Sequence, residues 1–377
     1  MLLNEDQLAI KRIIADIAEK IIAPKAAYYD ETEEFPWENI QKLSESGFMG
    51  MAVPEYLSGS EMDMVSQVVA LEEISKACAA TGAIVAVHNS VGILPILWKG
   101  TEEQKKKYLP ALATGRFIGA FALTEPGAGS DAAQAATTAV LDGDAYVLNG
   151  TKCFISNGGV ADVFVVFASK DKSKGVKGLS AFIVEKGTAG FTVGKHEKKM
   201  GIRASSTVEL HFDNCRIPVG NQLGKDGEGF KIAMMTLDTA RIGIAAQAVG
   251  IAEAAYEKAL DYSKIREQFG KPISANQAIQ FMLVDMAIQI EAARQLTYHA
   301  ASLKDAGLSF GKEAAMAKTF ASDISVQVAL DAIQIMGGYG YSREYPVERL
   351  LRDAKITQIY EGTNQIQRVV IGRQILH

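Results

Sequence analysis

The middle third of the chain restricts the fold most, because the spacing of its apolar side chains changes there from helical to strand-like. Residues 116–220 contain β-branched stretches with period-two alternation: RFIGAFALTE, AYVLNG, DVFVVFAS, LSAFIVE and STVELHF. No helical pattern separates these stretches. The sequence therefore predicts an antiparallel meander or a small β barrel rather than alternating βαβ units.

The residues on both sides of this zone have the spacing of helices. Asn4 with Gln7, and Thr101 with Gln104, fit the capping box that begins a helix. Between them, residues 62–98 are small and apolar, which is typical of helices buried on most sides. The stretches that predict long helices after the β zone are 230–262, 277–303 and 312–336. Helices of this length favour a four-helix bundle.

These patterns predict a mainly α chain with a middle β domain. We expect an N-terminal helical domain over residues 1–115, the β domain over 116–225, and the C-terminal four-helix bundle over 226–377. Within the β domain, Asp142-Gly143 and Asn149-Gly150 are dipeptides suited to type I′ hairpin turns.

Charge and composition argue against several kinds of partner. The net charge is −5 over 377 residues, and no basic block stands out, so we expect neither nucleic acid nor a membrane surface as a partner. No apolar run approaches the roughly 20 residues that cross a bilayer. Neither MLLNEDQLAI nor QILH resembles a targeting signal, which favours a cytoplasmic location.

Cysteine and histidine usage gives no indication of a metal. The three cysteines are far apart and form no CxxC pair, so we expect neither a disulfide framework nor a zinc site, and a reducing compartment fits. The five histidines lack metal-ligand spacing. His88 lies in an apolar, small-residue stretch and is expected to be a hydrogen-bonded core or interface residue.

Two segments of the β zone could hold a planar cofactor, although each also fits an ordinary structural element. LTEPGAGSDAA, residues 123–133, is either a strand-ending turn or a glycine-rich loop whose backbone N–H groups approach a phosphate or a flavin ring. In TKCFISNGG, Phe154 and Ser156 alternate with Ile155, so both side chains should share one face of a strand. That face is either a cofactor contact or a plain sheet surface.

Two further segments lie in the helical zone that follows. Arg266, in REQFGKPI, is either a phosphate or ribose contact or a surface arginine at a helix end. Glu361, in IYEGTNQIQR, has two interpretations. It could face a cleft, where loss of water would raise its pKa towards that of a useful base. It could instead lie in the first turn of the next helix and complement the helix dipole.

The motifs TEPGAGSD, FISNGG, KMGIRAS, LDTARIGIAAQAVGIA, R-x-Q-F-G-K-P, QIMGGYGY and IYEGTNQIQR occur in this order over nearly the whole chain. Together they resemble the acyl-CoA dehydrogenase family, most closely its bacterial short-chain (butyryl-CoA) members and related enoyl-CoA reductases. The resemblance implies a helical domain, a small β barrel and a four-helix bundle. It also implies non-covalent FAD, a homotetramer built as a dimer of dimers, and electron-transferring flavoprotein as partner.

The resemblance also assigns residues. The expected flavin contacts in the same chain are Phe121, Leu123, Thr124, Ser130, Phe154, Ile155 and Ser156. The expected contacts to the FAD of a neighbouring subunit are Arg266, Phe269 and Gln277. The remaining FAD contacts would be Gln334, Gly337, Gly338, Thr363, Asn364 and Gln365. The acyl-CoA contacts would be Ser130, Asp238, Arg241, Tyr360 and Gly362.

Glu361 matches the catalytic base of the family, which takes the α-proton of the thioester while a β-hydride moves to flavin N5. Some relatives place the base at a second position, which is Ala240 here and cannot accept a proton. Glu197 matches a position that contacts electron-transferring flavoprotein in a relative, and also fits a solvated charge run. Residues 53–63 depart from the family pattern near the expected cleft mouth, and the Gly-Tyr-Gly-Tyr run at 338–341 is unusually aromatic.

Several activities remain open at this point. The chain could oxidise a short acyl-CoA or reduce its 2-enoyl-CoA, and the altered cleft segment leaves an arylacrylyl-CoA such as caffeyl-CoA possible in an electron-bifurcating complex. It could also be an acyl-CoA oxidase or a non-catalytic flavin-binding protein. The intact set of Ser156, Arg241 and Glu361 argues against a non-catalytic protein.

Overall fold

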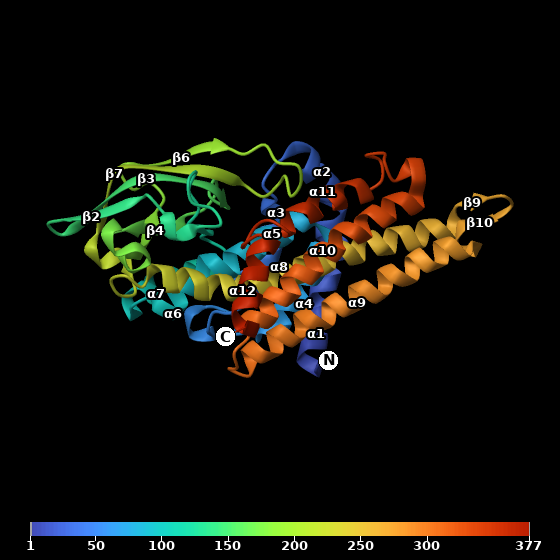
Figure 1. The fold of residues 1–377 in the computed structure, drawn as a ribbon, viewed down its shortest axis with the longest axis horizontal. Helices are drawn as coiled ribbons and strands as arrows, with labels where there is room; N and C mark the ends of the chain where they lie inside the picture. Colours follow the sequence, from blue (N-terminus) through green and yellow to red (C-terminus); the bar gives the residue numbers. More distant parts are fainter. Residues whose placement is uncertain (1, 377) are drawn as a thin grey trace.

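The three patterns read from the sequence correspond to three regions of the folded chain. The structure is a computed structural model that describes residues 2–376. Figure 1 shows strands β2 to β7 at one end of the molecule and the long C-terminal helices reaching to the other. This confirms the predicted fold class. Met1 and His377, the terminal residues of the two segments considered for targeting signals, lie outside the described residues. The exact domain boundaries stay a prediction.

The N-terminal region consists of short helices that pack around an apolar centre. They are α1 (Glu5–Ile17), α2 (Ala26–Thr32), α3 (Trp37–Glu45), α4 (Met64–Ala77), α5 (Ala79–Val87), α6 (Leu94–Lys99) and α7 (Glu102–Ala113), with the π-helical turns η1 (Ala18–Ile22) and η4 (His88–Ile93). Both predicted capping boxes are present: Asn4 with Gln7 begins α1, and Thr101 with Gln104 begins α7. Local sequence therefore determines where these two helices begin.

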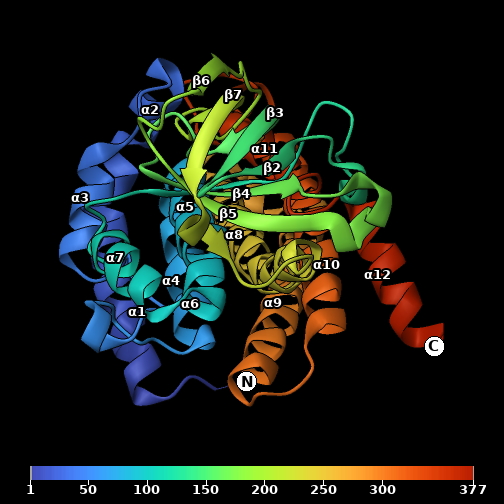
Figure 2. The ribbon, with the colours of Figure 1, turned by 90° about the vertical axis from the view of Figure 1, so that its left-hand side faces the viewer.

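The middle region is one large, bent sheet. Its strands are β1 (Gly119–Ala122), β2 (Thr138–Asp142), β3 (Ala145–Ser156), β4 (Val163–Ser169), β5 (Leu179–Glu185), β6 (Phe191–His196), β7 (Thr207–Pro218) and β8 (Gln222–Leu223). The order is β6-β7-β3-β2-β4-β5-β8, with β1 beside β4. The two ends of this order, β6 and β8, are not paired with each other, so hydrogen bonding does not close the expected barrel. Figure 2 shows this sheet lying over the helices.

Two expectations for the sheet were wrong. The strands are not a purely antiparallel meander, because β1 pairs with β4 in parallel and β2 also meets β4 in parallel. Asn149-Gly150 is not a turn, since β3 continues through it. The irregularity lies opposite, on β7, where Asn214 has a φ of 50° and its N–H donates to Asn149 Oδ1 at 2.8 Å. Asp142-Gly143 does lead into the predicted β2–β3 hairpin.

The C-terminal region contains three long helices and two shorter ones. They are α8 (Gly229–Ile265), α9 (Gln277–Asp305), α10 (Gly311–Met336), α11 (Val347–Thr357) and α12 (Asn364–Leu376), and the small hairpin β9 (Glu267–Gln268) and β10 (Lys271–Pro272) joins α8 to α9. Helices α8 to α11 pack on one another as the predicted bundle, with α11 as its short fourth member. Helix α12 packs on α10.

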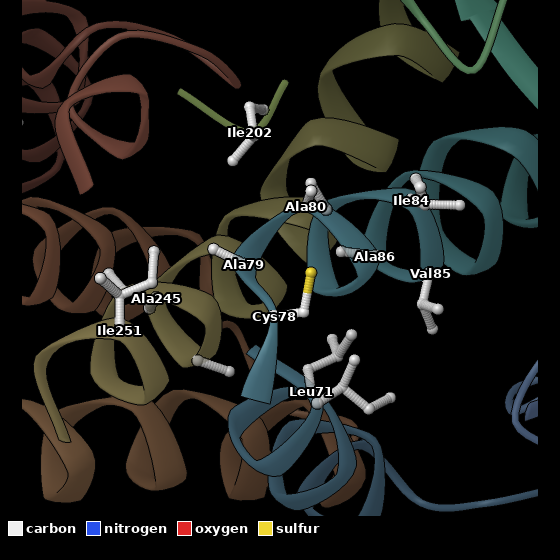
Figure 3. Packing of buried hydrophobic residues seen from close by; sticks show 14 of the residues in the cluster. Leu71, Cys78, Ala79, Ala80, Ile84, Val85, Ala86, Ile202, Ala245 and Ile251 are labelled. Atoms are coloured by element: carbon white, nitrogen blue, oxygen red, sulfur yellow. The ribbon is translucent and has the colours of Figure 1, made fainter. Parts of the chain in front are cut away.

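The main core lies where α4 and α5 meet α8. Small side chains such as Ala79, Ala80 and Ala245 let these helices approach closely, as Figure 3 shows around Cys78. The helical segment Ala79–Lys99 is by length and composition apolar enough to cross a membrane, contrary to the expectation that no run approached that length. However, 89% of its most apolar window is buried in the protein, as in the core helix of a globular domain.

One close contact ties this apolar segment to the sheet. Gly92, in η4, and Gly119, in β1, approach so closely that a Cβ on either would lie 3.0 Å from backbone atoms of the other. Next to them, the Gly119 N–H donates to Nδ1 of the fully buried His88, whose Nε2 lies 3.0 Å from the Leu112 carbonyl. Burial lowers the pKa of His88 to about 4. His88 is therefore the hydrogen-bonded core histidine that the sequence predicted.

We predict that Gly92→Ala destabilises the protein by about 1–3 kcal/mol, because the added methyl group meets backbone that cannot rotate away. Urea unfolding followed by circular dichroism measures this. Gly372→Ala in α12 is the matched control, since its Cβ would meet nothing within 4 Å and should stabilise that helix by up to about 1 kcal/mol. Equal unfolding midpoints for Gly92→Ala and the wild type would contradict the close contact.

Candidate functional site

Glu361 lies in the short turn that joins α11 to α12. It precedes the first residue of α12, Asn364, by three positions, so it is not in the first turn of that helix. Its φ is 54°, in the left-handed region that a non-glycine residue adopts at a cost of about 1–3 kcal/mol. Gly362 follows with a φ of 91°. The interpretation of Glu361 as a helix-dipole residue is therefore wrong, and the turn must be held by its surroundings.

Side chains from two helices hold this turn. Gln367 Nε2 donates to the carbonyls of Glu361 at 3.1 Å and Gly362 at 2.8 Å. Lys318, on α10, donates from Nζ to the same Gly362 carbonyl at 2.9 Å. With its φ of 91°, Gly362 has a backbone conformation that strains other residues, and a Cβ there would also lie 2.8 Å from Gln367 Nε2 and displace this amide.

The carboxylate of Glu361 is withdrawn from water. Part of the side chain keeps some exposed surface, but Oε2 is buried and makes no hydrogen bond within the described chain. Burial raises the pKa of Glu361 to about 7, against the opposing influence of Arg241 and Lys318. A carboxylate whose pKa lies near neutrality suits general base catalysis.

Arg241 brings a second buried cation to the turn. This α8 residue is 4% exposed, and its Nη2 would lie 3.9 Å from a Cβ on Gly362. Nη1 pairs with Asp238, one turn earlier on α8, whereas Nε is buried without a partner in the described chain. Burial lowers the pKa of Arg241, and Asp238 and Glu361 oppose this shift. The fold therefore brings together one polar group of Asp238, Arg241 and Glu361. In the sequence, these residues belong to two separate motifs.

An apolar wall adjoins this polar group. Val87, Val91 and Ala240 form a small buried cluster, against which Phe121 and Leu237 pack. Phe121 comes from β1, and its ring lies 4.8 Å from that of Phe167. Ala240, the second base position of the family, is thus enclosed by apolar side chains. The cluster connects the end of β1 to the helix that carries Arg241.

The glycine-rich loop after β1 is braced by a buried ion pair. Glu125 and Lys152, at 5% and 0% side-chain exposure, approach to 2.7 Å, and Lys152 Nζ also donates to the Leu123 carbonyl at 3.0 Å. Glu125 accepts from the Thr137 N–H at 3.0 Å, and the Cys153 N–H donates to the Thr124 carbonyl at 3.0 Å. The first residues of the loop, Leu123 to Glu125, are therefore fixed against β3.

A bulge in β3 displays an aromatic ring beside that loop. The pairing with β7 shifts between Lys152 and Ile155, and Phe154 takes a φ of 56° there. Its ring is 65% exposed, while Ile155 is buried in the sheet core and Ser156 is half-buried. Phe154 and Ser156 therefore face away from the sheet core, as the alternation predicted, and only the backbone of Ile155 can contribute on that side.

Other predicted site residues lie elsewhere in the chain. Arg266 caps the end of α8, and the fully exposed Phe269 lies in the β9–β10 hairpin that follows, at the end of the molecule opposite the sheet, as Figure 1 shows. Gln277 begins α9 beside this hairpin. The Arg266 guanidinium lies 5.6 Å from the centre of the Tyr339 ring, so it adjoins the end of α10, where Gln334, Gly337 and Gly338 are exposed. Within one chain, this group is separate from Phe121 and Phe154.

The remaining predicted positions have simpler surroundings. Thr363 caps α12 by accepting from the Ile366 N–H at 3.3 Å, and Gln365 and Ser130 are exposed. Glu197 pairs with Lys195 at 3.3 Å, which fits the charge-run interpretation. In the atypical segment 53–63, Val53 and Leu57 pack against apolar side chains of α7. Among residues 2–376, no three His, Cys, Asp or Glu side chains are placed to hold a metal ion.

Sequence reasoning missed four residues that shape the site: Lys152, Gln247, Lys318 and Gln367. The Tyr360 hydroxyl donates to Gln247 Oε1, and Gln247 Nε2 donates to the Ala79 carbonyl at 2.9 Å. Lys152, Gln247 and Gln367 all lie inside quoted segments, and a lone polar residue in an apolar run, such as Gln247 between Ala246 and Ala248, was an available signal. Lys318 lies in an alanine-rich helix where a lysine usually faces solvent, and no sequence signal marked it.

These residues fit a bound flavin. The bulge offers an aromatic face and a hydroxyl, and the adjoining loop offers open backbone at Gly127 and Gly129, where a Cβ would meet nothing within 4 Å. On the helical side, the unpartnered Glu361 Oε2 and Arg241 Nε offer polar atoms to a ligand. The Phe121 cluster joins the two sides through α8.

Family models match almost all of the chain. The acyl-CoA dehydrogenase N-terminal domain matches residues 4–116, the middle domain matches 120–215, and the C-terminal domain matches 227–376. A protein of Bacillus subtilis named acyl-CoA dehydrogenase is 56% identical over 376 residues, covering 100% of this chain and 99% of its own length. The acryloyl-CoA reductase (NADH) of Anaerotignum propionicum is 50% identical, covering 99% and 95%.

Solved structures agree with this result. A chain in the structure of the electron transferring flavoprotein of Acidaminococcus fermentans, concerned with flavin-based electron bifurcation, superposes with a TM-score of 0.99 at 54% identity, covering 100% of this chain and 99% of that one. The butyryl-CoA dehydrogenase of Megasphaera elsdenii superposes with a TM-score of 0.98 at 49% identity, covering 100% of both chains.

We predict that Lys152→Met destabilises the protein by about 3–5 kcal/mol, because it leaves the buried Glu125 carboxylate without a cation. Urea unfolding measures the loss, and the absorbance that remains after gel filtration measures bound flavin. The double variant Glu125→Gln with Lys152→Met should recover much of the stability. Lys174→Met, which breaks an exposed pair with Asp171, should change it by less than about 1 kcal/mol. Equal losses of stability in Lys152→Met and Lys174→Met would contradict a stabilising role for the buried Glu125–Lys152 ion pair.

Proposed function

The chain belongs to the acyl-CoA dehydrogenase family, and from this premise we propose that it interconverts short-chain acyl-CoA thioesters and 2-enoyl-CoA thioesters. Members of this family are FAD-dependent oxidoreductases. Bound FAD would supply the hydride acceptor for the β-carbon of the substrate. The Megasphaera elsdenii butyryl-CoA dehydrogenase, similar over its whole length, supports the short-chain assignment.

The observation that carries the proposal is the buried, unpartnered Oε2 of Glu361 in its left-handed turn. We assign Glu361 as the base that takes the α-proton of the thioester. Burial already raises its pKa to about 7, so the ionised form is present at neutral pH and still basic enough to accept a proton. Its backbone N–H, in the same turn, would stabilise negative charge developing on the thioester oxygen.

Other residues of the chain would position the two ligands. Phe121, Leu123, Thr124, Ser130, Phe154, Ile155 and Ser156 would border the flavin, and Thr363, Gln365, Gln334, Gly337 and Gly338 would contact the rest of FAD. Ser130, Asp238, Arg241, Tyr360 and Gly362 would hold the acyl-CoA. The bulge at Phe154 and the braced loop after β1 support the first set, and the closeness of Arg241 to Gly362 supports the last.

The short-chain preference would follow from a buried hydrogen-bonded pair behind the base. Gln247 is fully buried, and it links the Tyr360 hydroxyl to the Ala79 carbonyl across the α8–α5 contact. A long acyl chain entering beside Glu361 would have to displace these groups and leave their polar atoms unpaired, which costs about 1–3 kcal/mol for each atom. A short chain would stop before them.

Assembly would complete the FAD site. We propose a homotetramer, built as a dimer of dimers, in which Arg266, Phe269 and Gln277 reach the FAD of a neighbouring subunit. Phe269 is 99% exposed with a φ of 56°, and Phe281, Val284 and Ile288 form an exposed apolar stripe on α9. An apolar row of this kind on one face of a helix favours a protein partner.

Electron exchange would use electron-transferring flavoprotein, in a cytoplasmic setting. The similarity to a chain in the Acidaminococcus fermentans structure supports this partner. The Anaerotignum propionicum reductase supports the reverse direction, the reduction of an enoyl-CoA. An arylacrylyl-CoA, reduced in an electron-bifurcating complex, would be one such substrate. All three cysteines are buried and free, which fits a reducing compartment.

We predict that Glu361→Gln keeps bound FAD but slows flavin bleaching by butyryl-CoA about 10³-fold or more. In the wild type, only ionised Glu361 accepts a proton, so the bleaching rate should rise with pH and level off above about 7. Anaerobic stopped-flow absorbance measures both effects. Glu344→Gln, at an exposed position, is the control and should bleach at the wild-type rate. Rapid bleaching by Glu361→Gln would remove Glu361 from the role of base.

We predict that Gln247→Ala widens the substrate range, because it opens the space behind Tyr360. The kcat/KM for octanoyl-CoA relative to butyryl-CoA should rise at least about tenfold. A steady-state assay with a dye acceptor measures this ratio. Gln41→Ala, at an exposed glutamine of α3, should leave it unchanged. A ratio equal to the wild-type value in Gln247→Ala would show that the pair does not limit chain length.

A further inference from the structure

The α10 helix places an ammonium group inside the protein next to the Glu361 turn. Lys318 is 0% exposed, although a lysine is almost never fully buried unless it is paired. Its Nζ donates to the Gly362 carbonyl at 2.9 Å and to Asn364 Oδ1 at 2.8 Å. Both acceptors are neutral, so the positive charge is not cancelled by a carboxylate bonded to it. The carboxylate that attracts it most strongly is Glu361.

We propose that Lys318 is a positioning residue for Glu361, holding the turn in its left-handed conformation and supplying the buried positive charge that keeps the carboxylate ionised. This inference rests on the proposed role of Glu361 as the base. Lys318 lies on a different helix and donates a hydrogen bond to the turn. It would contact neither the α-proton that Glu361 removes nor the thioester.

A polar cluster fixes the position of the ammonium group. Ser322 Oγ donates to the Lys318 carbonyl at 2.6 Å and accepts from Asn364 Nδ2 at 2.9 Å. Asn364 Nδ2 also donates to Asp323 Oδ1 at 2.7 Å. The amide of Asn364 is thereby oriented with its oxygen towards Lys318. Helix α10 and the first turn of α12 thus present the ammonium to the turn at a fixed place.

The charge matters as well as the hydrogen bonds. A nearby opposite charge lowers the pKa of a carboxyl group. Burial alone raises the pKa of Glu361, and Lys318 and Arg241 act against it. The same burial lowers the pKa of Lys318 to about 7, which Glu361 opposes, so the ammonium is mostly charged below that pH, where the rate of the wild type is rising. Removing the ammonium should therefore make Glu361 harder to ionise.

The other charged groups around the pair define what the test must hold constant. From α8, Arg241 faces Glu361 and is paired with Asp238. On α10, Asp323 interacts with Lys318 and is paired with Arg368 of α12 at 3.2 Å. None of these is changed by a substitution at Lys318, so a shift in the pH dependence reports the ammonium itself.

The test uses the FAD-loaded, full-length protein with Lys318→Met and Lys318→Gln. The measured quantity is the rate of anaerobic flavin bleaching by butyryl-CoA as a function of pH. Both variants should move the rising limb of this profile to higher pH by about one to three units. Lys318→Gln, which keeps a donor for the Gly362 carbonyl, should retain a higher plateau rate than Lys318→Met. A merely structural role would lower the rate without moving the limb.

Matched controls make the outcomes decisive. Lys312→Met removes a more exposed lysine from the same helix and should leave the limb and the rate unchanged. A limb at the wild-type pH in both Lys318 variants, with flavin bound, would overturn the proposal. Failure of the proposed function looks different, because Glu361→Gln would then bleach at the wild-type rate.

A milder change covers the case in which neither Lys318 variant retains flavin. Ser322→Ala removes the hydroxyl that orients the Asn364 amide but leaves the ammonium and the Gly362 carbonyl in place. Because a less firmly held ammonium acts less on Glu361, the limb should move to higher pH, by less than in the Lys318 variants. A limb at the wild-type pH in Ser322→Ala would count against the proposal.

Discussion

The rest of the structure depends on one arrangement: a carboxylate withdrawn from water, with two buried cations beside it. Removing a charge from water costs several kcal/mol, and the protein offsets that cost only if the opposite charges stay at fixed positions. Arg241 comes from α8 and Lys318 from α10, so these two helices, which pack extensively on each other, must keep their relative position. The left-handed backbone of Glu361 persists for the same reason, because Gln367 and Lys318 hold the carbonyls of the turn.

Helix α8 is the element that connects this turn to the rest of the chain. Arg241 faces the turn, and Ala240 packs in the cluster reached by Phe121 of the sheet. Farther along the same helix, Gln247 bonds to the carbonyl of Ala79 in the N-terminal region. A single helix thus positions groups from three regions, which explains why its buried residues are mostly alanine, glycine and isoleucine. Larger side chains would push the sheet or α5 away from the site.

The sequence predicted what is decided locally. The capping boxes, the strand alternation at Phe154 and Ser156, and the buried character of residues 62–98 all depend on neighbours along the chain. Its errors came from distant pairing: the parallel contact of β1 with β4, and Asn149-Gly150, where a bulge around Asn214 replaces a turn. For the candidate site, the motifs singled out Glu361 and Arg241, which the fold brings close together. Lys318 escaped because burial of a lysine in an alanine-rich helix depends wholly on how that helix packs.

The distribution of site residues bears on why such a chain would assemble. The sheet-side residues and the Glu361 turn are joined through α8, whereas Arg266 and Phe269 lie at the far end of the molecule (Figure 1). No rearrangement of side chains brings those two groups together in one chain. Phe269 destabilises the isolated chain in two ways, through its left-handed backbone and through the exposure of its apolar ring to water. Contact with a second copy would offset the part that comes from exposure. Association would then complete the cofactor site at the same step as it buries the hairpin, so that flavin binding and assembly would be thermodynamically linked.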